Sequence, residues 1–168
     1  MKKIINPWTE KEGYDCFACS PSNPVGLHME FYEDGDDIVG IWHPSKHYQG
    51  WLETMHGGIL CTLMDETAGW VVTRKMQTTG MTSKLEVKFR KAVPTDEETL
   101  TVRAHLTDCH RNIAFISMTL ENAQGETCVE GEAAYFTFNK ETARNMGFER
   151  CEVENENEKK DDGSATFA

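Results

Sequence analysis

One segment of the chain, residues 56–76, has the apolar spacing of a single long helix, and it limits the folds that the rest can adopt. Its apolar side chains recur every three or four positions, so in a helix they form one wide face that must be buried. These residues are Ile59, Leu60, Leu63, Met64, Ala68, Val71 and Val72. Because no other segment has a convincing helical pattern, we expect strands to cover this face.

Six further segments alternate between apolar and polar residues, as do strands with one buried and one wet face. Residues 27–33 and 38–43 flank a Glu-Asp-Gly-Asp-Asp turn and predict a β-hairpin. The other four follow the helix, at residues 82–90, 99–107, 113–121 and 126–138. An antiparallel sheet wrapped around one central helix is an α+β fold. One helix cannot cover six strands and the sheet has free edges, so we expect a homodimer or a dimer of dimers (a homotetramer).

The length of 168 residues suits one domain. We expect an irregular N-terminal segment over residues 1–24 and the folded domain over residues 25–140. Residues 141–168 are polar and acidic, and we expect a tail there that is disordered at its end.

The charge balance excludes several kinds of partner. The net charge is −11, and residues 149–162 alone contribute −4 through seven acidic and three basic side chains. Such a surface repels nucleic acid and anionic lipid, so we expect neither as a partner. No apolar run is long enough for a membrane helix, and the first residues have no apolar export signal. We therefore expect a cytoplasmic protein whose six cysteines are reduced.

The predicted helix begins with His56-Gly57-Gly58, and the two glycines cost helix stability. Without side chains they let a ligand reach the unpaired N–H groups of the first turn, which suit a carbonyl oxygen that gains negative charge. The alternative is that the glycines allow close packing of the helix on a strand. The residues alone favour neither interpretation.

Asp65 lies in the middle of the same helix, where aspartate is an unfavourable residue. Its neighbours at helical spacing are small or apolar, so its carboxylate is expected to be partly buried, and it is a candidate general base or nucleophile. The alternative is a carboxylate that faces solvent or makes a structural hydrogen bond. Glu66 is the second candidate, and we expect it nearer the wet side of the helix.

These motifs together resemble a known family. His56-Gly57-Gly58 followed by Leu63-Met64-Asp65-Glu66 is similar to the signature of hotdog-fold acyl-CoA thioesterases, in the phenylacetate-pathway (PaaI-like) branch of the 4-hydroxybenzoyl-CoA thioesterase superfamily. Cys16-Phe17-Ala18-Cys19 with Asn23-Pro24-Val25-Gly26-Leu27 resembles the N-terminal element common in that branch. The segments 81–85 and 89–94 resemble its strand after the helix. The resemblance covers roughly residues 14–138.

The resemblance implies hydrolysis of an acyl-CoA to a free acid and CoA, without a metal or any cofactor beyond the CoA of the substrate. It implies that the Gly57 N–H polarises the thioester carbonyl and that His56 shapes the start of the helix. Asp65, facing the partner subunit's site, would activate water or attack the carbonyl, and the Thr82 hydroxyl would orient the water or the carboxylate. Further substrate contacts are expected from Gln49, Trp51, Gly58 and Glu66.

The chain departs from the family pattern at one place. Related enzymes often carry Asn or Gln about six residues before the histidine, where this chain has Gly50 beside Gln49. Gln49 is the candidate to replace that contact.

Two other patterns leave alternatives open. Lys84 and Arg90 belong to a basic stripe that either lies on a solvated sheet face or attracts the CoA phosphates. Cys16 and Cys19 have a zinc-type spacing, but no second pair follows at the usual distance, so packing thiols and no metal are expected.

Two other functions compete with thioester hydrolysis. The first is binding of acyl-CoA without turnover. The second is a hotdog dehydratase or hydratase, which would pair a catalytic His with an acid across the dimer.

Overall fold

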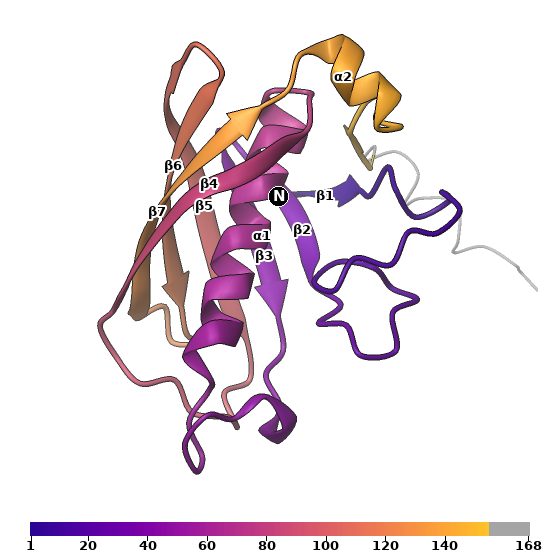
Figure 1. Ribbon diagram of the computed structural model, residues 1–168. Coiled ribbons are helices and arrows are strands. Elements are labelled where there is room, and N and C mark those ends of the chain that lie inside the picture. The colour runs from indigo at the N-terminus through magenta and orange to yellow at the C-terminus, as the bar shows by residue number, and fades with distance from the viewer. Residues whose placement is uncertain (155–168) are drawn as a thin grey trace, which may run out of the picture.

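The computed structural model describes residues 1–154, which form one antiparallel sheet around one long helix (Figure 1). The sheet has eight strands in the order β4-β7-β6-β5-β3-β2-β1-β8. Their bounds are β1 Lys2–Ile5, β2 Glu30–Asp34, β3 Asp37–Trp42, β4 Gly80–Phe89, β5 Leu100–His110, β6 Ile113–Glu121, β7 Thr127–Thr137 and β8 Glu152–Val153. The helices are α1, Gly57–Lys75, and the short α2, Lys140–Asn145, with a 3₁₀ turn at Lys46–Tyr48.

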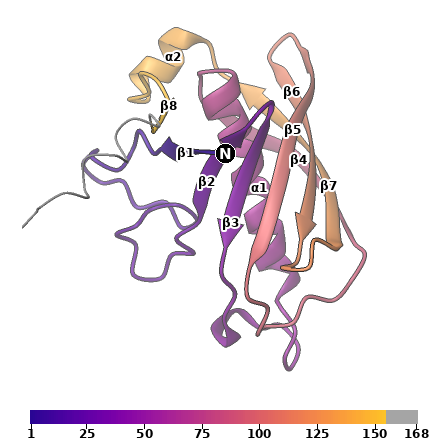
Figure 2. The ribbon, with the colours of Figure 1, turned by 180° about the vertical axis from the view of Figure 1, so that it is seen from behind.

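Helix α1 lies on the concave face of the curled sheet, and in the reverse view the strands β3, β5 and β6 lie in front of it (Figure 2). It buries one wide face, as the apolar spacing predicts, and the buried residues are Leu60, Leu63, Met64, Thr67, Ala68, Trp70, Val71 and Val72. No helix within residues 1–154 is long and apolar enough to cross a membrane.

Two glycines of the sheet let α1 approach closely. A Cβ on Gly40 of β3 would lie 2.5 Å from Thr67 Oγ1, and one on Gly131 of β7 would lie 2.9 Å from Met64 Cε. Real Cβ atoms do not make such contacts, so a larger residue at either position would force the Thr67 or Met64 side chain of α1 to move.

The α+β class, the central helix and the strands predicted from residue 27 to residue 138 are confirmed. The hairpin β2–β3 pairs Asp34 with Asp37 across its turn, and the four later strands pair in the antiparallel way that their alternation indicates.

The two ends of the chain hold more secondary structure than the sequence predicts. Residues 1–24, predicted to be irregular, contain β1, and residues 141–154, predicted to be a polar tail, contain most of α2 and all of β8. Strand β1 pairs with β8 through Ile4 and Val153, and the buried ring of Phe148 lies against Trp8 with centroids 5.8 Å apart. The N-terminal and C-terminal segments therefore pack against each other, and each helps to fix the structure of the other. The predicted disorder after residue 154 lies outside the described residues.

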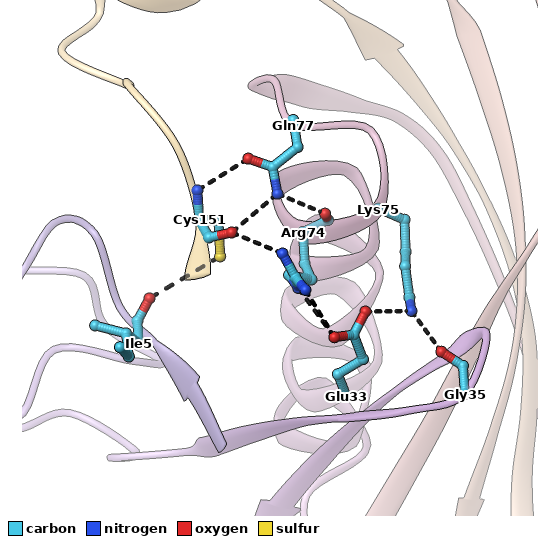
Figure 3. A network of polar contacts seen from close by, with 7 residues as sticks. All are labelled: Ile5, Glu33, Gly35, Arg74, Lys75, Gln77 and Cys151. Atoms are coloured by element: carbon cyan, nitrogen blue, oxygen red, sulfur yellow. Dashed lines mark hydrogen bonds and ion pairs between the residues drawn. The ribbon is translucent and has the colours of Figure 1, made fainter. Parts of the chain in front are cut away.

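A network of ion pairs joins the C-terminal end of α1 to the hairpin (Figure 3). Glu33 of β2 accepts hydrogen bonds from Arg74, at 2.8 Å, and from Lys75, at 2.6 Å. Arg74 and Gln77 also donate to the Cys151 carbonyl oxygen, so the network reaches the C-terminal segment. Burial by itself would raise the pKa of Glu33, but the hydrogen bonds from Lys75 and Arg74 outweigh it and lower that pKa.

Replacing Glu33 with glutamine is expected to lower the free energy of unfolding by about 2 kcal/mol at neutral pH, because two largely buried cations lose their anion. The folded-state pKa of Glu33 is lowered, so its stabilisation is present above its unfolded-state pKa of about 4.3 and is lost as the pH falls through the folded-state pKa. Urea unfolding of both proteins from pH 7 down to pH 3 checks this. Equal stabilities at pH 7, or a difference that grows on acidification, would contradict it.

Candidate active site

Asp65 is held from two sides by hydroxyl groups of the sheet. Thr82 of β4 donates through Oγ1 to Asp65 Oδ1 at 2.8 Å. The buried Tyr135 of β7 places its hydroxyl 2.7 Å from the same Oδ1 and 2.6 Å from the Asp65 carbonyl oxygen. Burial first, and then the charge of Asp65, raise the pKa of Tyr135, so its hydroxyl keeps its proton and remains a donor. Among the described residues none donates to Oδ2, which is left for water or substrate.

A β-bulge in β4 brings Thr82 to this position. The pairing of β4 with β7 shifts between Thr82 and Lys84, and Ser83 Oγ donates to the Ala134 carbonyl oxygen at 2.8 Å. The shift lets Thr82 face the helix on one side of the bulge while Leu85 packs against the core on the other.

A cavity of about 640 Å³ opens beside Asp65, between α1, the start of β4 and the N-terminal segment. Its polar groups include Asp65, Glu66 and Thr82. Much of its wall is apolar, with Trp8, Tyr14, Trp70, Met81 and Met146. The cavity therefore combines an apolar volume with a small number of convergent polar groups, which is typical of a ligand site.

Glu66 lies in this cavity wall and not on a wet side of the helix, so the expected position is wrong. Trp70 Nε1 donates to Glu66 Oε1 at 3.1 Å, and Cys16 Sγ of the N-terminal segment lies 3.6 Å from the same oxygen. Burial raises the pKa of Glu66 to about 7. The segment that covers Glu66 comes from fifty residues earlier in the chain, which the helical spacing of α1 does not reveal.

The start of α1 is separate from Asp65. His56 is the N-cap, and its Nδ1 accepts from the Gly58 N–H at 2.9 Å. The N–H of Gly58 is thus occupied, so it does not donate a hydrogen bond to a substrate while His56 caps the helix. The Gly57 N–H has no hydrogen-bond partner within residues 1–154. Gly57 and Asp65 are eight residues apart, or about 12 Å along the helix axis.

The loop before α1 holds the other predicted contacts. Gln49 is exposed and forms an isolated antiparallel bridge with Met55 beside the helix start, where the neighbouring Tyr48 carbonyl oxygen accepts from the His56 N–H at 2.9 Å. A Cβ on Gly50 would lie 3.1 Å from the His56 Cα. A larger residue would therefore be crowded at this position, where related enzymes often carry Asn or Gln. Trp51 is 84% exposed and does not line the cavity of its own chain.

Lys84 and Arg90 do not reach the Asp65 cavity. Lys84 lies on the outer face of the sheet, where it lines a different hollow, and it pairs with Glu86 at 3.0 Å. Arg90 pairs with Glu130 at 2.8 Å. Their expected role in substrate binding is therefore not supported within one chain: the bulge after Thr82 turns Lys84 outward, and nearby glutamates neutralise both cations.

The residues that could hold a metal lie at one place in the described chain. The ligand atoms of Cys16, Cys19 and Glu66 lie within 4.8 Å of one another.

Tyr135 is the residue of this site that the sequence analysis missed. It lies at an inward-facing position of a predicted strand, and a buried tyrosine needs a partner for its hydroxyl. That requirement was a usable signal, but the sequence does not say which residue the hydroxyl meets.

For the acyl-CoA hydrolysis that the family resemblance implies, replacing Tyr135 with phenylalanine is expected to lower kcat about tenfold, with a much smaller change in KM, because the Asp65 carboxylate loses one of the two hydroxyl groups that bind it within residues 1–154. Turnover of an acyl-CoA measured over a range of concentrations checks this. The matched control is Tyr32→Phe, whose hydroxyl bonds Glu30 away from the site. A Tyr135→Phe protein with unchanged kcat would show that Tyr135 does not position Asp65.

Comparison with known proteins agrees with this architecture. Residues 52–129 match the family model described as the thioesterase superfamily. A hypothetical thioesterase of Streptococcus pneumoniae, solved with coenzyme A, is similar with a TM-score of 0.61 and 21% identity, over 66% of this chain and 86% of that one. A thioesterase of Haemophilus influenzae gives a TM-score of 0.64 at 18% identity, over 72% and 85%. A protein of Streptococcus mutans bound to acetyl-CoA gives 0.62 at 15% identity, over 67% and 90%.

The chain has the hotdog fold. This confirms the fold that the helix motif implied, while the phenylacetate-pathway branch stays a prediction. A search of curated proteins gives no match.

Proposed function

We propose that the protein hydrolyses acyl-CoA thioesters to a free acid and CoA. The observation that carries the proposal is the carboxylate of Asp65, which is fixed by Thr82 and Tyr135 at the wall of a largely apolar cavity. A fixed carboxylate, one oxygen of which receives no hydrogen bond from the described residues, suits a general base that takes a proton from water, or a nucleophile that attacks the carbonyl carbon. The apolar wall suits an acyl group.

In support of this chemistry, the Gly57 N–H has no hydrogen-bond partner in the part of the chain that the structure describes, and it lies at the positive end of the α1 dipole. Such a donor stabilises the oxygen of a thioester carbonyl as it gains negative charge. The Gly57 N–H and the Asp65 carboxylate must both lie about 3 Å from the reacting atoms. Because Gly57 and Asp65 of one chain are about 12 Å apart along α1, one chain cannot present both to one carbonyl.

The proposal therefore includes a second copy of the chain, in which Asp65 of one copy meets Gly57 of the other. Strand β4 is an end strand of the sheet, and two of its side chains, Met81 and Phe89, are 60% and 55% exposed. An exposed edge strand with apolar side chains favours pairing with another chain. A homodimer, or a dimer of dimers, would bring two such sites together.

The ligands of two similar structures support the choice of thioester. The Streptococcus pneumoniae protein carries coenzyme A and the Streptococcus mutans protein carries acetyl-CoA. The dehydratase alternative has less support, because the His56 ring is engaged as the helix cap.

Loss of thioester ultraviolet absorbance across a panel of acyl-CoA compounds tests the activity. Direct absorbance is preferable to thiol reagents, which would also react with the six cysteines. Turnover of at least one acyl-CoA, with free CoA identified by mass, is the expected result. If the protein binds acyl-CoA compounds but hydrolyses none of them, the non-catalytic binding function replaces the proposal.

A further inference from the structure

Cys16 and Cys19 form a thiol pair in the wall of the Asp65 cavity. Their Sγ atoms are 2.7 Å apart, and the Cys19 backbone N–H donates to Cys16 Sγ at 3.2 Å. Cys16 is half-buried and Cys19 is buried. The Glu66 carboxylate lies beneath the pair, 3.6 Å from Cys16 Sγ, and the Tyr14 hydroxyl lies 2.8 Å from Cys19 Sγ.

The two thiols have different acidities. Hydrogen bonds from the Cys19 thiol and from backbone N–H groups lower the pKa of Cys16, although burial opposes them. The bond to Cys16 and burial raise the pKa of Cys19. The more accessible sulfur is thus the better anion, and the buried sulfur needs an acceptor for its proton. Glu66, whose pKa burial raises to about 7, has a carboxylate oxygen within 4.8 Å of the Cys19 sulfur and is the acceptor that this cluster offers.

We propose that Cys16 and Cys19 are a site of thiol–disulfide exchange with low-molecular-weight disulfides. The Cys16 thiolate attacks one sulfur of the disulfide, whose S–S bond breaks to release the first thiolate, and a mixed disulfide forms on Cys16. Cys19 gives its proton to the Glu66 carboxylate and attacks the Cys16 sulfur, which releases the second thiolate. The two cysteines lose two protons and two electrons, and the small disulfide is reduced to two thiols.

The spacing of the two sulfurs favours this chemistry over a metal site. Two sulfurs bound to one tetrahedral zinc ion at about 2.3 Å stand about 3.8 Å apart. The 2.7 Å between Cys16 Sγ and Cys19 Sγ is well short of that separation. Within the described residues the other four cysteines, Cys61, Cys109, Cys128 and Cys151, make no thiol–thiol contact.

The test follows the full-length reduced protein by intact mass after addition of glutathione disulfide or CoA disulfide, with alkylation to stop the reaction and peptide mapping to locate each modification. We expect a Cys16–Cys19 disulfide to form at least about tenfold faster than Cys109, the exposed thiol, is modified. The Cys19→Ser variant should hold the mixed disulfide on Cys16. The Glu66→Gln variant should accumulate it transiently. Cys109→Ser is the matched control and should behave like the native protein.

The two disulfides separate the possible sources of the modification. A faster reaction with CoA disulfide than with glutathione disulfide would indicate that the disulfide reaches Cys16 through the Asp65 cavity. Equal rates would indicate that the pair reacts with small disulfides in general. Modification of Cys109 while Cys16 and Cys19 stay reduced would overturn the proposal, as would a stoichiometric zinc ion that protects the pair in the isolated protein. The readout is a mass, so it is independent of the proposed hydrolysis, and thermal melting of each variant establishes that it is folded.

Discussion

Replacing Asp65 with asparagine is expected to lower acyl-CoA turnover at least about a hundredfold while the protein remains folded. Asparagine has nearly the same shape and can keep one hydrogen bond to Thr82 or Tyr135, but it can neither accept a proton from water nor attack a carbonyl carbon. The measurement is kcat/KM for an acyl-CoA that the native protein hydrolyses, together with Tm for both proteins.

The control for this change is Asp96→Asn, which makes the same chemical substitution on an exposed loop. It should keep native turnover. Full activity in Asp65→Asn would instead assign the chemistry to another group, of which Glu66 is the nearest carboxylate.

Replacing Gly57 with proline is expected to lower kcat about a hundredfold, because proline removes the single N–H that the proposal assigns to the carbonyl oxygen. Gly57 is the first residue of α1, where proline is well tolerated, and His56 before it has the extended backbone that precedes proline. Turnover and far-ultraviolet circular dichroism together separate a loss of the donor from a loss of the helix.

Gly57→Ala is the matched control, because alanine keeps the N–H. Its Cβ would lie 3.4 Å from Phe89 Cζ, at the lower end of ordinary contact. We expect it to retain most of the native turnover. If the proline and alanine variants were equally active, the Gly57 N–H would have no part in the reaction.

The sequence predicts the central helix and most of the strands around it, because the spacing of apolar residues within one segment is a local property. The spacing within residues 56–76 gives the helix, and a polar residue at its middle, Asp65, is found in the candidate site. The Thr82 prediction came from family resemblance, and the hydrogen bond to Asp65 gives that residue a position consistent with its expected role.

The errors share one physical origin, since each depends on contacts between segments that are distant in the chain. Glu66 was expected to be wet because nothing in α1 shows that the N-terminal segment covers it. For Lys84 the single chain agrees with the solvated sheet face, one of the two alternatives that the basic stripe left open, and its part in CoA binding stays a prediction. The two termini were expected to be irregular because neither contains enough apolar surface to predict a fold without the other. The cytoplasmic location and the oligomeric state remain predictions.

The central claim is that two copies of the chain build one hydrolytic site, and turnover in mixed oligomers tests it most directly. Asp65→Asn and Gly57→Pro, each nearly inactive alone, are co-expressed with different tags, and the mixed species is purified. In a mixed dimer one site has lost both groups and the other has both intact. The account predicts about half the native turnover per mixed dimer, or about one quarter in an unfractionated equal mixture. A mixed dimer as inactive as its parents would contradict the account, because Asp65 and Gly57 would then have to act within one chain.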